Sequence, residues 1–346
     1  MTHIARPSAS ARELATARLA ALATPPGALG RLGDLGVWMS ACQGQVPPSP
    51  LDNVRLVIFA GDHGVAEYGV SAFPPAITGA MVRTFLAGKA GVSAVAAAHG
   101  VHVRVLDLGV NEDFVDVPQD LRAELTARKI RKSSGSIHLE DALSADQTRR
   151  ALDAGAQVAR EEIAAGAQLL ISGDMGIGNT TPAAALIAAG LGLTGADVAG
   201  RGTGIDDAGL EHKAAVIDAA LERIGNRSED PYENLQSLSS ADLAATTGYL
   251  IEAATSGVPV LLDGLMSVAC ALTANRLQPG VAEWFAAGHR STEPAQSLAL
   301  EALGLVPILD LGMRLGEGSG AVAAVPIVRS AVAILRDVAL LSELGI

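Results

Sequence analysis

Residues 310–320 read Asp-Leu-Gly-Met-Arg-Leu-Gly-Glu-Gly-Ser-Gly. Before them the apolar run 304–309 predicts a buried strand, and after them residues 321–328 predict an apolar helix that Arg329 interrupts. Glu317 has glycine on both sides, so the backbone can turn tightly there. A carboxylate between the carboxyl end of a strand and the start of a helix lies where open α/β sheets bind their ligands.

Glu317 has two readings at this point. It could be a solvated glutamate in a flexible loop. Its neighbours are almost wholly apolar, however, so we expect the carboxyl group to be partly desolvated and chemically useful. We therefore predict Glu317 as a general base.

Composition narrows the class of protein. Hydrophobic residues make up 49% of the 346 residues and charged residues 18%, which suits a large core of helices packed on a sheet. The net charge of −12 argues against nucleic acid or an anionic membrane as a partner. No uncharged apolar run approaches the roughly 20 residues of a membrane span, and arginines punctuate the N-terminal segment, unlike a signal peptide. Cys42 and Cys270 match no metal spacing and are expected to be buried thiols in a reducing, cytoplasmic protein.

Strand and helix patterns alternate along most of the chain. Buried strands are predicted at 54–59, 101–106, 168–172 and 258–262. Helices are predicted at 8–22, 29–39, 144–165, 211–224, 242–255, from 263 through 274, at 283–287 and from Pro294, the third of these opening on a capping box of Ser144 and Gln147. The polar stretch 110–142, with its basic run 128–132, is expected to run over the surface.

This order of elements predicts an α/β fold. We expect a three-layer, Rossmann-like, mostly parallel sheet with helices on both faces. Proline-rich residues 47–50 end the opening helices, so we predict a small helical subdomain at 1–50 and an α/β catalytic domain at 51–346.

Polar loops follow the predicted strands. They are Gly61-Asp-His-Gly64, Asp107-Leu-Gly109, residues 173–181, Asp263-Gly264, Gly288-His-Arg-Ser291 and the Glu317 loop. In a parallel sheet the carboxyl ends of the strands share one edge, so these loops should converge there. Asp62 and His63 could ligate a divalent ion, but no companion cluster is visible, and we predict no metal. His63 more simply holds backbone or a substrate oxygen.

The loop Gly173-Asp-Met-Gly-Ile-Gly-Asn-Thr-Thr181 predicts a phosphate site. Gly176 and Gly178 allow close backbone approach, Asn179 and Thr180 offer donors, and exposed amides at a helix N-terminus bind anions. A turn that merely needs small residues is the plainer alternative. A second glycine loop, Gly200-Arg-Gly-Thr-Gly204, precedes a helix whose Lys213 could supply a point charge, although a lone helical lysine is commonly solvated.

Taken together, these segments resemble the nicotinate-nucleotide:dimethylbenzimidazole phosphoribosyltransferases, which make the lower-ligand nucleotide of cobalamin. The resemblance runs almost from end to end. It rests on Pro25-Pro-Gly-Ala-Leu-Gly-Arg-Leu32, Phe59–Glu67, Gly69–Pro74, the loop 173–181, Gly200–Gly204, Gly288–Ser291 and Met313-Arg-Leu-Gly-Glu-Gly-Ser-Gly320.

The resemblance implies roles for particular residues. Glu317 would be the general base, with Asp174 as a second catalytic carboxylate. The nucleotide phosphate and ribose would be held by the two glycine loops, Lys213 and Ser291, and the aromatic base would lie against Met175 and Leu315. The implied substrate-binding set is Met175, Gly176, Gly178, Asn179, Thr180, Gly202, Thr203, Lys213, Ser291, Arg314 and Leu315.

The implied activity transfers phosphoribose from nicotinate mononucleotide to 5,6-dimethylbenzimidazole, without a cofactor. The resemblance also implies a homodimer in which the N-terminal helices pack near the partner's active site. Two residues depart from the family pattern. Asp174 stands where many relatives carry glutamate, and Ala80 stands where glutamine is common, so the preferred base is left open.

Two other classes of function stay open. A nicotinamide-dependent dehydrogenase would share the fold class, but no Rossmann glycine spacing followed by an acidic residue ~20 positions on is present. A non-catalytic nucleotide-sensing protein would keep the phosphate loops and would not need Glu317.

Overall fold

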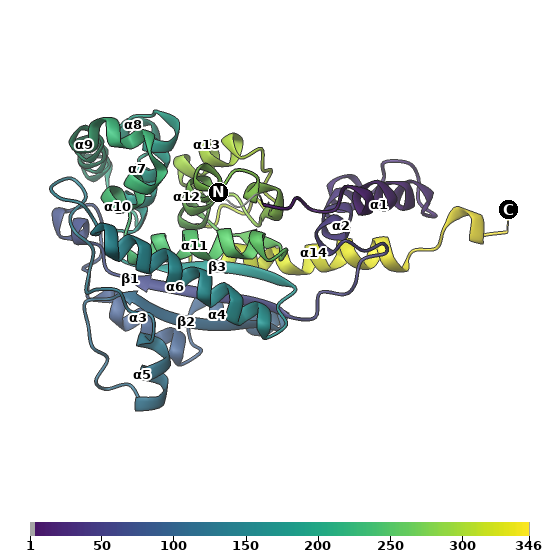
Figure 1. Ribbon diagram of the computed structural model, residues 1–346, viewed down its shortest axis with the longest axis horizontal. Helices are drawn as coiled ribbons and strands as arrows, with labels where there is room; N and C mark the ends of the chain where they lie inside the picture. Colours follow the sequence, from purple (N-terminus) through teal and green to yellow (C-terminus); the bar gives the residue numbers. More distant parts are fainter. Residues whose placement is uncertain (1–3, 346) are drawn as a thin grey trace.

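The computed structural model, which describes residues 4–345, has a central parallel sheet. Figure 1 shows this sheet inside the larger body of the molecule. Its five strands lie in the order β2-β1-β3-β4-β5, every neighbouring pair is parallel, and their bounds are β1 Val54–Gly61, β2 Val101–Gly109, β3 Leu169–Met175, β4 Val260–Leu262 and β5 Phe285–Ala287. The predicted fold class is confirmed. The chain order reverses between β1 and β3, which is where such sheets bind ligands.

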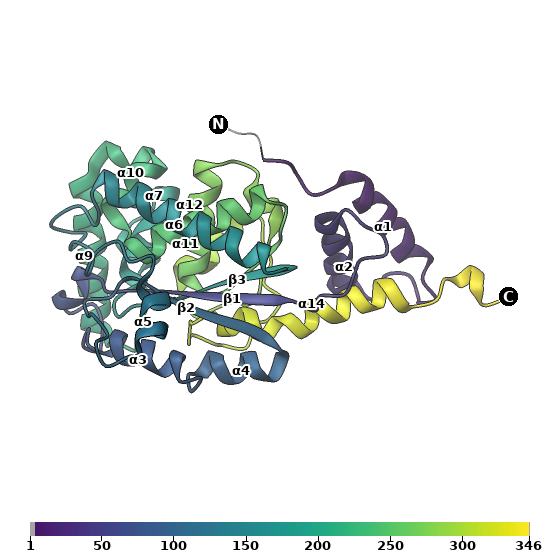
Figure 2. The same ribbon diagram turned by 60° about the horizontal axis from the view of Figure 1, so that its bottom comes forward.

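Helices cover both faces of the sheet (Figure 2). One face carries α6 Ala145–Ala164, α11 Ala241–Thr255 and α12 Leu265–Leu277, and the other carries α3 Ile77–Leu86, α4 Gly91–His99 and α14 Ser319–Asp337. Strand residues are buried on both sides, as the continuous apolar runs predict. Side chains of alternate strand residues therefore join two separate apolar cores.

The remaining helices complete the body. They are α5 Gln119–Thr126, α7 Thr180–Leu191, α8 Gly195–Val198, α9 Asp207–Ile224, α10 Pro231–Leu238 and α13 Pro294–Ala302, with short 3₁₀ helices at Gly64–Tyr68, Gly225–Glu229, Val281–Trp284 and Leu341–Glu343. Helices α7, α8, α9 and α10 lie together at one end of the molecule in both ribbon views. Helix α7 begins directly after the loop that follows β3.

The N-terminal helices α1 Ala9–Ala21 and α2 Gly30–Gln43 project from the body with the C-terminal half of α14 (Figures 1 and 2). Gly36 lets α2 pack closely against α14, because a Cβ at position 36 would be 2.8 Å from the carbonyl oxygen of Ala331. Arg18 donates to the carbonyls of Leu335 and Arg336. The boundary at residue 50 stays a prediction, and we propose that the helical subdomain also includes the end of α14.

Two predicted elements are wrong. Residues 283–287, predicted as a helix, form the end of a 3₁₀ turn and the edge strand β5, because a run of four apolar residues can complete a strand but barely one helical turn. Residues 304–309, predicted as a strand, form no strand. Pro307 has no N–H to give to a ladder, and only Leu309 makes an isolated bridge, to His289.

The sequence analysis predicted that Arg329 interrupts the last helix, and this prediction is wrong. Helix α14 continues through it, and its guanidinium donates to the carbonyls of Leu51 at 2.9 Å and His99 at 2.5 Å. By length and composition α14 is the one described helix that could cross a membrane. Over half of it is buried, against the sheet, α4 and α2.

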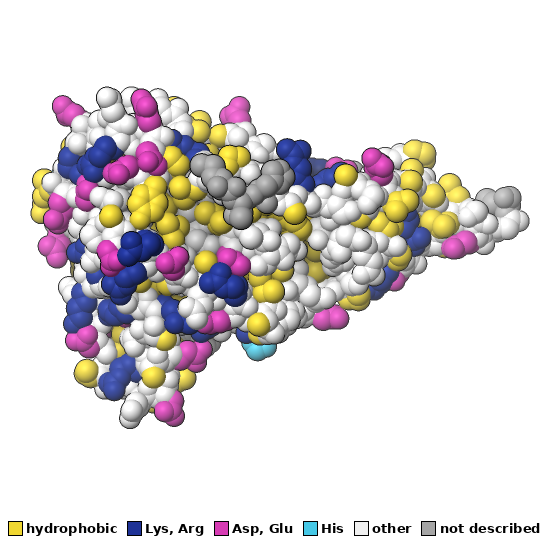
Figure 3. Space-filling view, in the orientation of Figure 1, with side chains coloured by type: hydrophobic (Ala, Val, Ile, Leu, Met, Phe, Trp, Pro, Cys, Tyr) yellow, Lys and Arg dark blue, Asp and Glu magenta, His cyan; other side chains and the backbone are white. Residues whose placement is uncertain are grey.

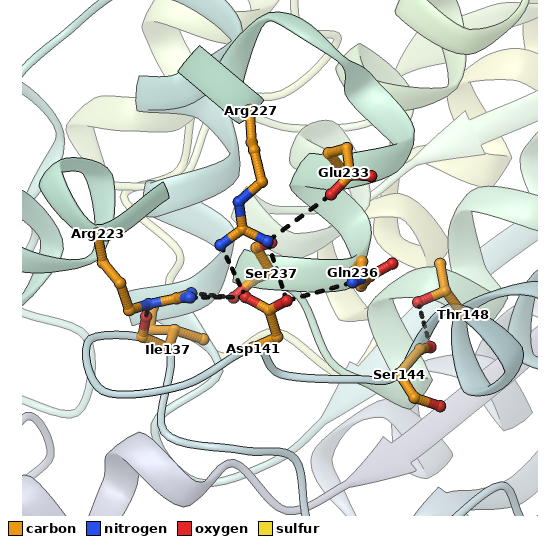
Figure 4. Close-up of polar contacts among 9 residues, drawn as sticks. All are labelled: Ile137, Asp141, Ser144, Thr148, Arg223, Arg227, Glu233, Gln236 and Ser237. Carbon is orange, nitrogen blue, oxygen red and sulfur yellow. Dashed lines mark hydrogen bonds and ion pairs between the residues drawn. The ribbon is translucent and has the colours of Figure 1, made fainter. Parts of the chain in front are cut away.

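The segment 110–142 is packed more closely than predicted. Phe114 and Leu125 are buried in the core, and basic residues 128, 129 and 132 each pair with a carboxylate. Its end is fixed by Asp141, shown in Figure 4, which accepts from Arg223 at 2.6 Å and from both terminal nitrogens of Arg227 at 3.0 Å. These two guanidinium groups hold the pKa of the Asp141 carboxyl well below its usual range.

The predicted capping box and the two predicted buried thiols are confirmed. Ser144 and Gln147 exchange both capping hydrogen bonds at the start of α6. Cys42 and Cys270 are both free and buried, and burial raises the pKa of each thiol.

Candidate active site

A cavity of about 600 Å³ opens beside the carboxyl ends of β3 and β4. It is lined by every predicted site residue except Lys213, namely Asp174, Met175, Gly176, Gly178, Asn179, Thr180, Gly202, Thr203, Ser291, Arg314, Leu315 and Glu317. The structure therefore brings the loop 173–181, Gly264, Ser291 and the Glu317 loop to one cavity, as parallel strands predict, whereas the loops at 61–64 and 107–109 do not line it.

Glu317 lies at one end of this cavity, in a constrained backbone. Its φ is +64°, between Gly316 at +76° and Gly318 at +93°, so three consecutive residues occupy the left-handed region. Such a conformation is costly for a residue with a side chain and persists where the surroundings enforce it. Asp263 enforces it here, accepting from the N–H groups of Gly318 and Ala321, each at 3.0 Å.

The carboxyl group of Glu317 is buried, with 6% of the residue exposed, and accepts a hydrogen bond from the backbone N–H of Val92 at 3.0 Å. Val92 lies in the first turn of α4, where unpaired amides and the helix dipole favour an anion. Burial acts in the opposite direction and is the larger effect, so the pKa of Glu317 is raised above its ordinary value. A raised carboxyl pKa suits a general base.

Gly173 explains how Glu317 can come so near the sheet. A Cβ at Gly173 would lie 2.3 Å from the carbonyl oxygen of Glu317, so only glycine fits on this face of β3. Asp174, the next residue, points to the opposite face because successive strand side chains alternate. The two predicted catalytic carboxyl groups thus reach the cavity from opposite faces of the sheet.

Asp174 is buried, and its Oδ1 accepts from the Nδ2 of Asn179 at 2.6 Å. Its other neighbour is Asp242, in the first turn of α11, which the sequence analysis treated only as the start of a helix. Burial and the nearby charge of Asp242 raise the pKa of Asp174 well above its ordinary value. The sequence held no signal for this role of Asp242, because an acidic residue in the first turn of a helix is the ordinary preference.

His63 lies behind this carboxyl pair and not along the cavity. Its Nε2 is 3.5 Å from Oδ2 of Asp242, and it lies so close to Gly176 that a Cβ there would be 2.5 Å away. The prediction that His63 holds backbone or a substrate oxygen is therefore not supported, because neither ring nitrogen has a hydrogen-bond partner among the described residues and His63 does not line the cavity. Asp62 accepts from the N–H of Asn111 at 2.8 Å. Among residues 4–345 no three His, Cys, Asp or Glu side chains are grouped to hold a metal ion.

The other end of the cavity offers donors for an anion. Helix α7 begins at Thr180, and Lys213, fully buried, donates to Thr180 Oγ1 at 2.8 Å and to the Gly200 carbonyl at 2.9 Å. Burial lowers the pKa of Lys213 to about 8. Lys213 is thus not the solvated helical lysine that its sequence context commonly indicates.

The glycine loop 200–204 is fixed beside Lys213 by two charged side chains. Glu293 accepts from the N–H of Gly202 at 2.8 Å, and Arg314 donates to the Gly202 carbonyl at 2.7 Å. Thr203 accepts from the backbone N–H of Ala72 at 2.9 Å. Glu293 is a cavity residue that the sequence analysis missed, although it follows the Gly288–Ser291 motif by two positions.

Apolar side chains make up much of the cavity lining. Ile77, Met81, Met175, Met266 and Leu315 all line the cavity, and Leu315 also packs against Gly91 beside Glu317. Ala80 is exposed on α3 and does not line the cavity. The arrangement can hold a flat apolar ring near a buried carboxylate while an anion binds near Lys213.

Comparison with known proteins agrees with this geometry. Residues 4–346 match the family model described as "Phosphoribosyltransferase" (DBI_PRT), and the chain belongs to this family of phosphoribosyltransferases. The resemblance read from the sequence is confirmed.

The family's members have a more specific name. The chain is 51% identical over 343 residues to the nicotinate-nucleotide–dimethylbenzimidazole phosphoribosyltransferase of Mycobacterium avium, covering 99% of this chain and 97% of that protein. It is 49% identical to the protein of the same name from Mycobacterium tuberculosis, over 99% of this chain and 93% of the relative. The crystal structure of CobT from Thermus thermophilus superposes with a TM-score of 0.92 at 42% identity, over 97% of this chain and 99% of that one.

Proposed function

We propose that this enzyme transfers the 5-phosphoribosyl group from nicotinate mononucleotide to 5,6-dimethylbenzimidazole, giving alpha-ribazole 5'-phosphate and nicotinate in cobalamin biosynthesis. One observation carries the proposal. A single cavity is lined by a buried carboxyl group, Glu317, by apolar side chains, and by residues at the start of α7, where Thr180 accepts a hydrogen bond from the buried Lys213. The reaction needs a matching arrangement, with the azole beside a proton acceptor and the phosphate of the ribose beside hydrogen-bond donors and a positive charge.

The substrates fit the two ends by their chemistry. The phosphate would bind the amides at the start of α7, with Lys213 supplying the opposite charge. The benzimidazole would lie against Met175 and Leu315, with its N–H directed at Glu317. Holding both reactants in one geometry removes much of the entropic barrier to a bimolecular reaction.

The reaction then needs one proton acceptor. The unprotonated ring nitrogen of the benzimidazole attacks the anomeric carbon of the ribose and forms the new C–N bond. The bond to nicotinate breaks, and its electron pair neutralises the pyridinium nitrogen, so the leaving group needs no proton. The product benzimidazole would carry a positive charge, which is removed when Glu317 takes the proton from the other ring nitrogen.

An assay for free nicotinate tests the proposal. Purified protein is incubated with nicotinate mononucleotide and 5,6-dimethylbenzimidazole, and nicotinate and the new nucleotide are separated by chromatography. We expect both products in equal amounts, and neither when the base is omitted. A nucleotide-sensing protein would bind the mononucleotide and release nothing, and a dehydrogenase would change only an added nicotinamide cofactor.

We also propose that the protein acts in the cytoplasm as a homodimer. The projecting helical part supports the second proposal, because exposed leucines at positions 14, 341 and 344 lie in its elements and in the C-terminal segment after α14. Figure 3 shows hydrophobic side chains along this narrow end of the molecule. Apolar side chains on a small projecting unit are typical of a surface that another chain covers.

A further inference from the structure

The carboxyl groups of Asp174 and Asp242 face each other without a donor between them. Among the described residues, Oδ2 of Asp174 and both carboxyl oxygens of Asp242 are buried and accept no hydrogen bond. Asp242 packs so tightly that a Cβ on Gly61 would be 2.2 Å from its Oδ1. Two ionised carboxylates so placed would repel each other in a medium that screens poorly, so the pair must hold a proton.

The surroundings decide which carboxyl group holds that proton. Asp242 lies in the first turn of the 15-residue helix α11, whose positive end stabilises a charge, and His63 Nε2 is 3.5 Å from it. Asp174 has no such support, since its one donor is the neutral amide of Asn179. Two other titratable groups lie near Asp174. They are the carboxyl group of Asp263, which follows β4, and the thiol of Cys270 on α12.

We propose that Asp174 is held as a neutral carboxylic acid whose proton is donated from Oδ2 to Asp242. Asp242 does not line the cavity and acts through Asp174, so it is a positioning residue. Glu317 is then the carboxyl group of the cavity pair that is free to accept a proton. The inference deepens the proposed function and rests on it only for its kinetic readout.

The direction of the pKa of Asp174 agrees with this assignment, because burial and Asp242 both favour its protonated form. The assignment also replaces the role that the family resemblance implied for Asp174. A neutral acid does not stabilise a developing positive charge on the ribose as a second carboxylate would. Its chemical task is to keep the cavity floor uncharged and the loop of Asn179 in place.

Carbon-13 NMR of protein labelled at the aspartate carboxyl carbons tests the proton directly. In the native protein without substrates we expect one aspartate with the chemical shift of a protonated acid at pH 7, and a deuterium isotope shift in D₂O. Asp174→Asn should remove that resonance, and Asp242→Asn should convert it to a carboxylate resonance, because an asparagine amide can donate to Asp174. If every aspartate of the native protein is ionised at pH 7, the inference is wrong, whether or not either variant folds.

Kinetics give the second test. Asp174→Asn keeps a donor toward Asp242 and an acceptor for Asn179, so the loss of turnover should be well below the ~10²–10⁴-fold loss expected for a proton-transfer group. A hundredfold loss of turnover with an unchanged KM would instead make Asp174 a charged catalytic group. The NMR result needs no substrate, so an inactive protein with one protonated aspartate would contradict the proposed function and leave the proton assignment standing.

Discussion

The carboxyl oxygen Oε2 of Glu317 accepts a hydrogen bond from the backbone N–H of Val92, 225 positions earlier in the chain. The helix that begins beside Val92 and the left-handed turn that holds Glu317 are separate elements, and this hydrogen bond joins them. The contact orients the carboxyl group and moderates the effect of burial on its pKa. Glu317 is therefore a fixed acceptor and not a mobile loop side chain.

Glu317→Gln should lower turnover by ~10²–10⁴-fold, because glutamine keeps the shape but cannot accept the proton of the azole. Binding of nicotinate mononucleotide should change little, so the loss should appear in kcat rather than in the KM for the nucleotide. The kcat of the native enzyme should also fall as the pH is lowered through the raised pKa of Glu317, because the carboxylate then becomes protonated and cannot accept a proton. If the variant loses less than about tenfold, the group orients the azole without taking its proton.

Lys213→Ala should raise the KM for nicotinate mononucleotide, since a charge-assisted hydrogen bond contributes about 1–3 kcal/mol. The exposed Lys89→Ala is the matched control and should leave KM unchanged. Because the pKa of Lys213 is about 8, the free protein carries this cation below that pH and loses it above. Native kcat/KM for the nucleotide should accordingly decline as pH rises through about 8, and an alanine variant with native saturation would remove Lys213 from the phosphate site.

Turnover should survive exhaustive chelation. The leaving group departs from a pyridinium ring and accepts the electron pair without help from a Lewis acid. The measurement is the rate of nicotinate release before and after treatment with a chelator. Activity that vanished and then returned with an added divalent ion would bring Asp62 and His63 back as candidate ligands.

Light scattering at low micromolar concentration should report a dimer. Leu14 on α1 is 63% exposed, so Leu14→Arg should increase the monomer fraction if this helix packs against a partner. Leu139, 60% exposed on the opposite, larger part of the molecule, supplies the control variant Leu139→Arg, which should leave the mass unchanged. A native monomer with full activity would contradict the proposed assembly.

Asp141→Asn should destabilise the fold by about 1–3 kcal/mol, because the carboxylate serves two arginines and Gln236. Asp113→Asn, at an exposed ion pair with Lys132, should leave the free energy of unfolding almost unchanged. The pKa of Asp141 is depressed in the folded state, so its contribution is complete above the unfolded value of about 4 and is lost as pH falls below it. Denaturant unfolding at pH 7 and at pH 3 should show the difference between native protein and Asp141→Asn shrinking at low pH.

The sequence predicted best what local patterns decide. Apolar runs predicted β1, β3 and β4, and alternating apolar and polar residues predicted β2. Glycines around Glu317 indicated a turn, which the structure shows in the left-handed region. Edge strand β5 was not predicted, because three residues are too few to show an alternating pattern. Residues 304–309 were predicted as a strand, but Pro307 cannot donate a hydrogen bond to a neighbouring strand. Asp242 escaped for a different reason. Nothing near it in the chain shows that the first turn of α11 faces Asp174.

Helix α14 joins the Glu317 turn at its first residue to the contact between Gly36 and Ala331 near its other end. A continuous helix has no slack, since each residue adds 1.5 Å of length and about 100° of rotation. One residue inserted in its middle would swing α1 and α2 to another side of the molecule, whereas seven residues would return them within about 20° of their original direction. We therefore expect single-residue insertions and deletions in the middle of α14 to be poorly tolerated. A change of seven residues, about two turns, should disturb the direction of α1 and α2 least.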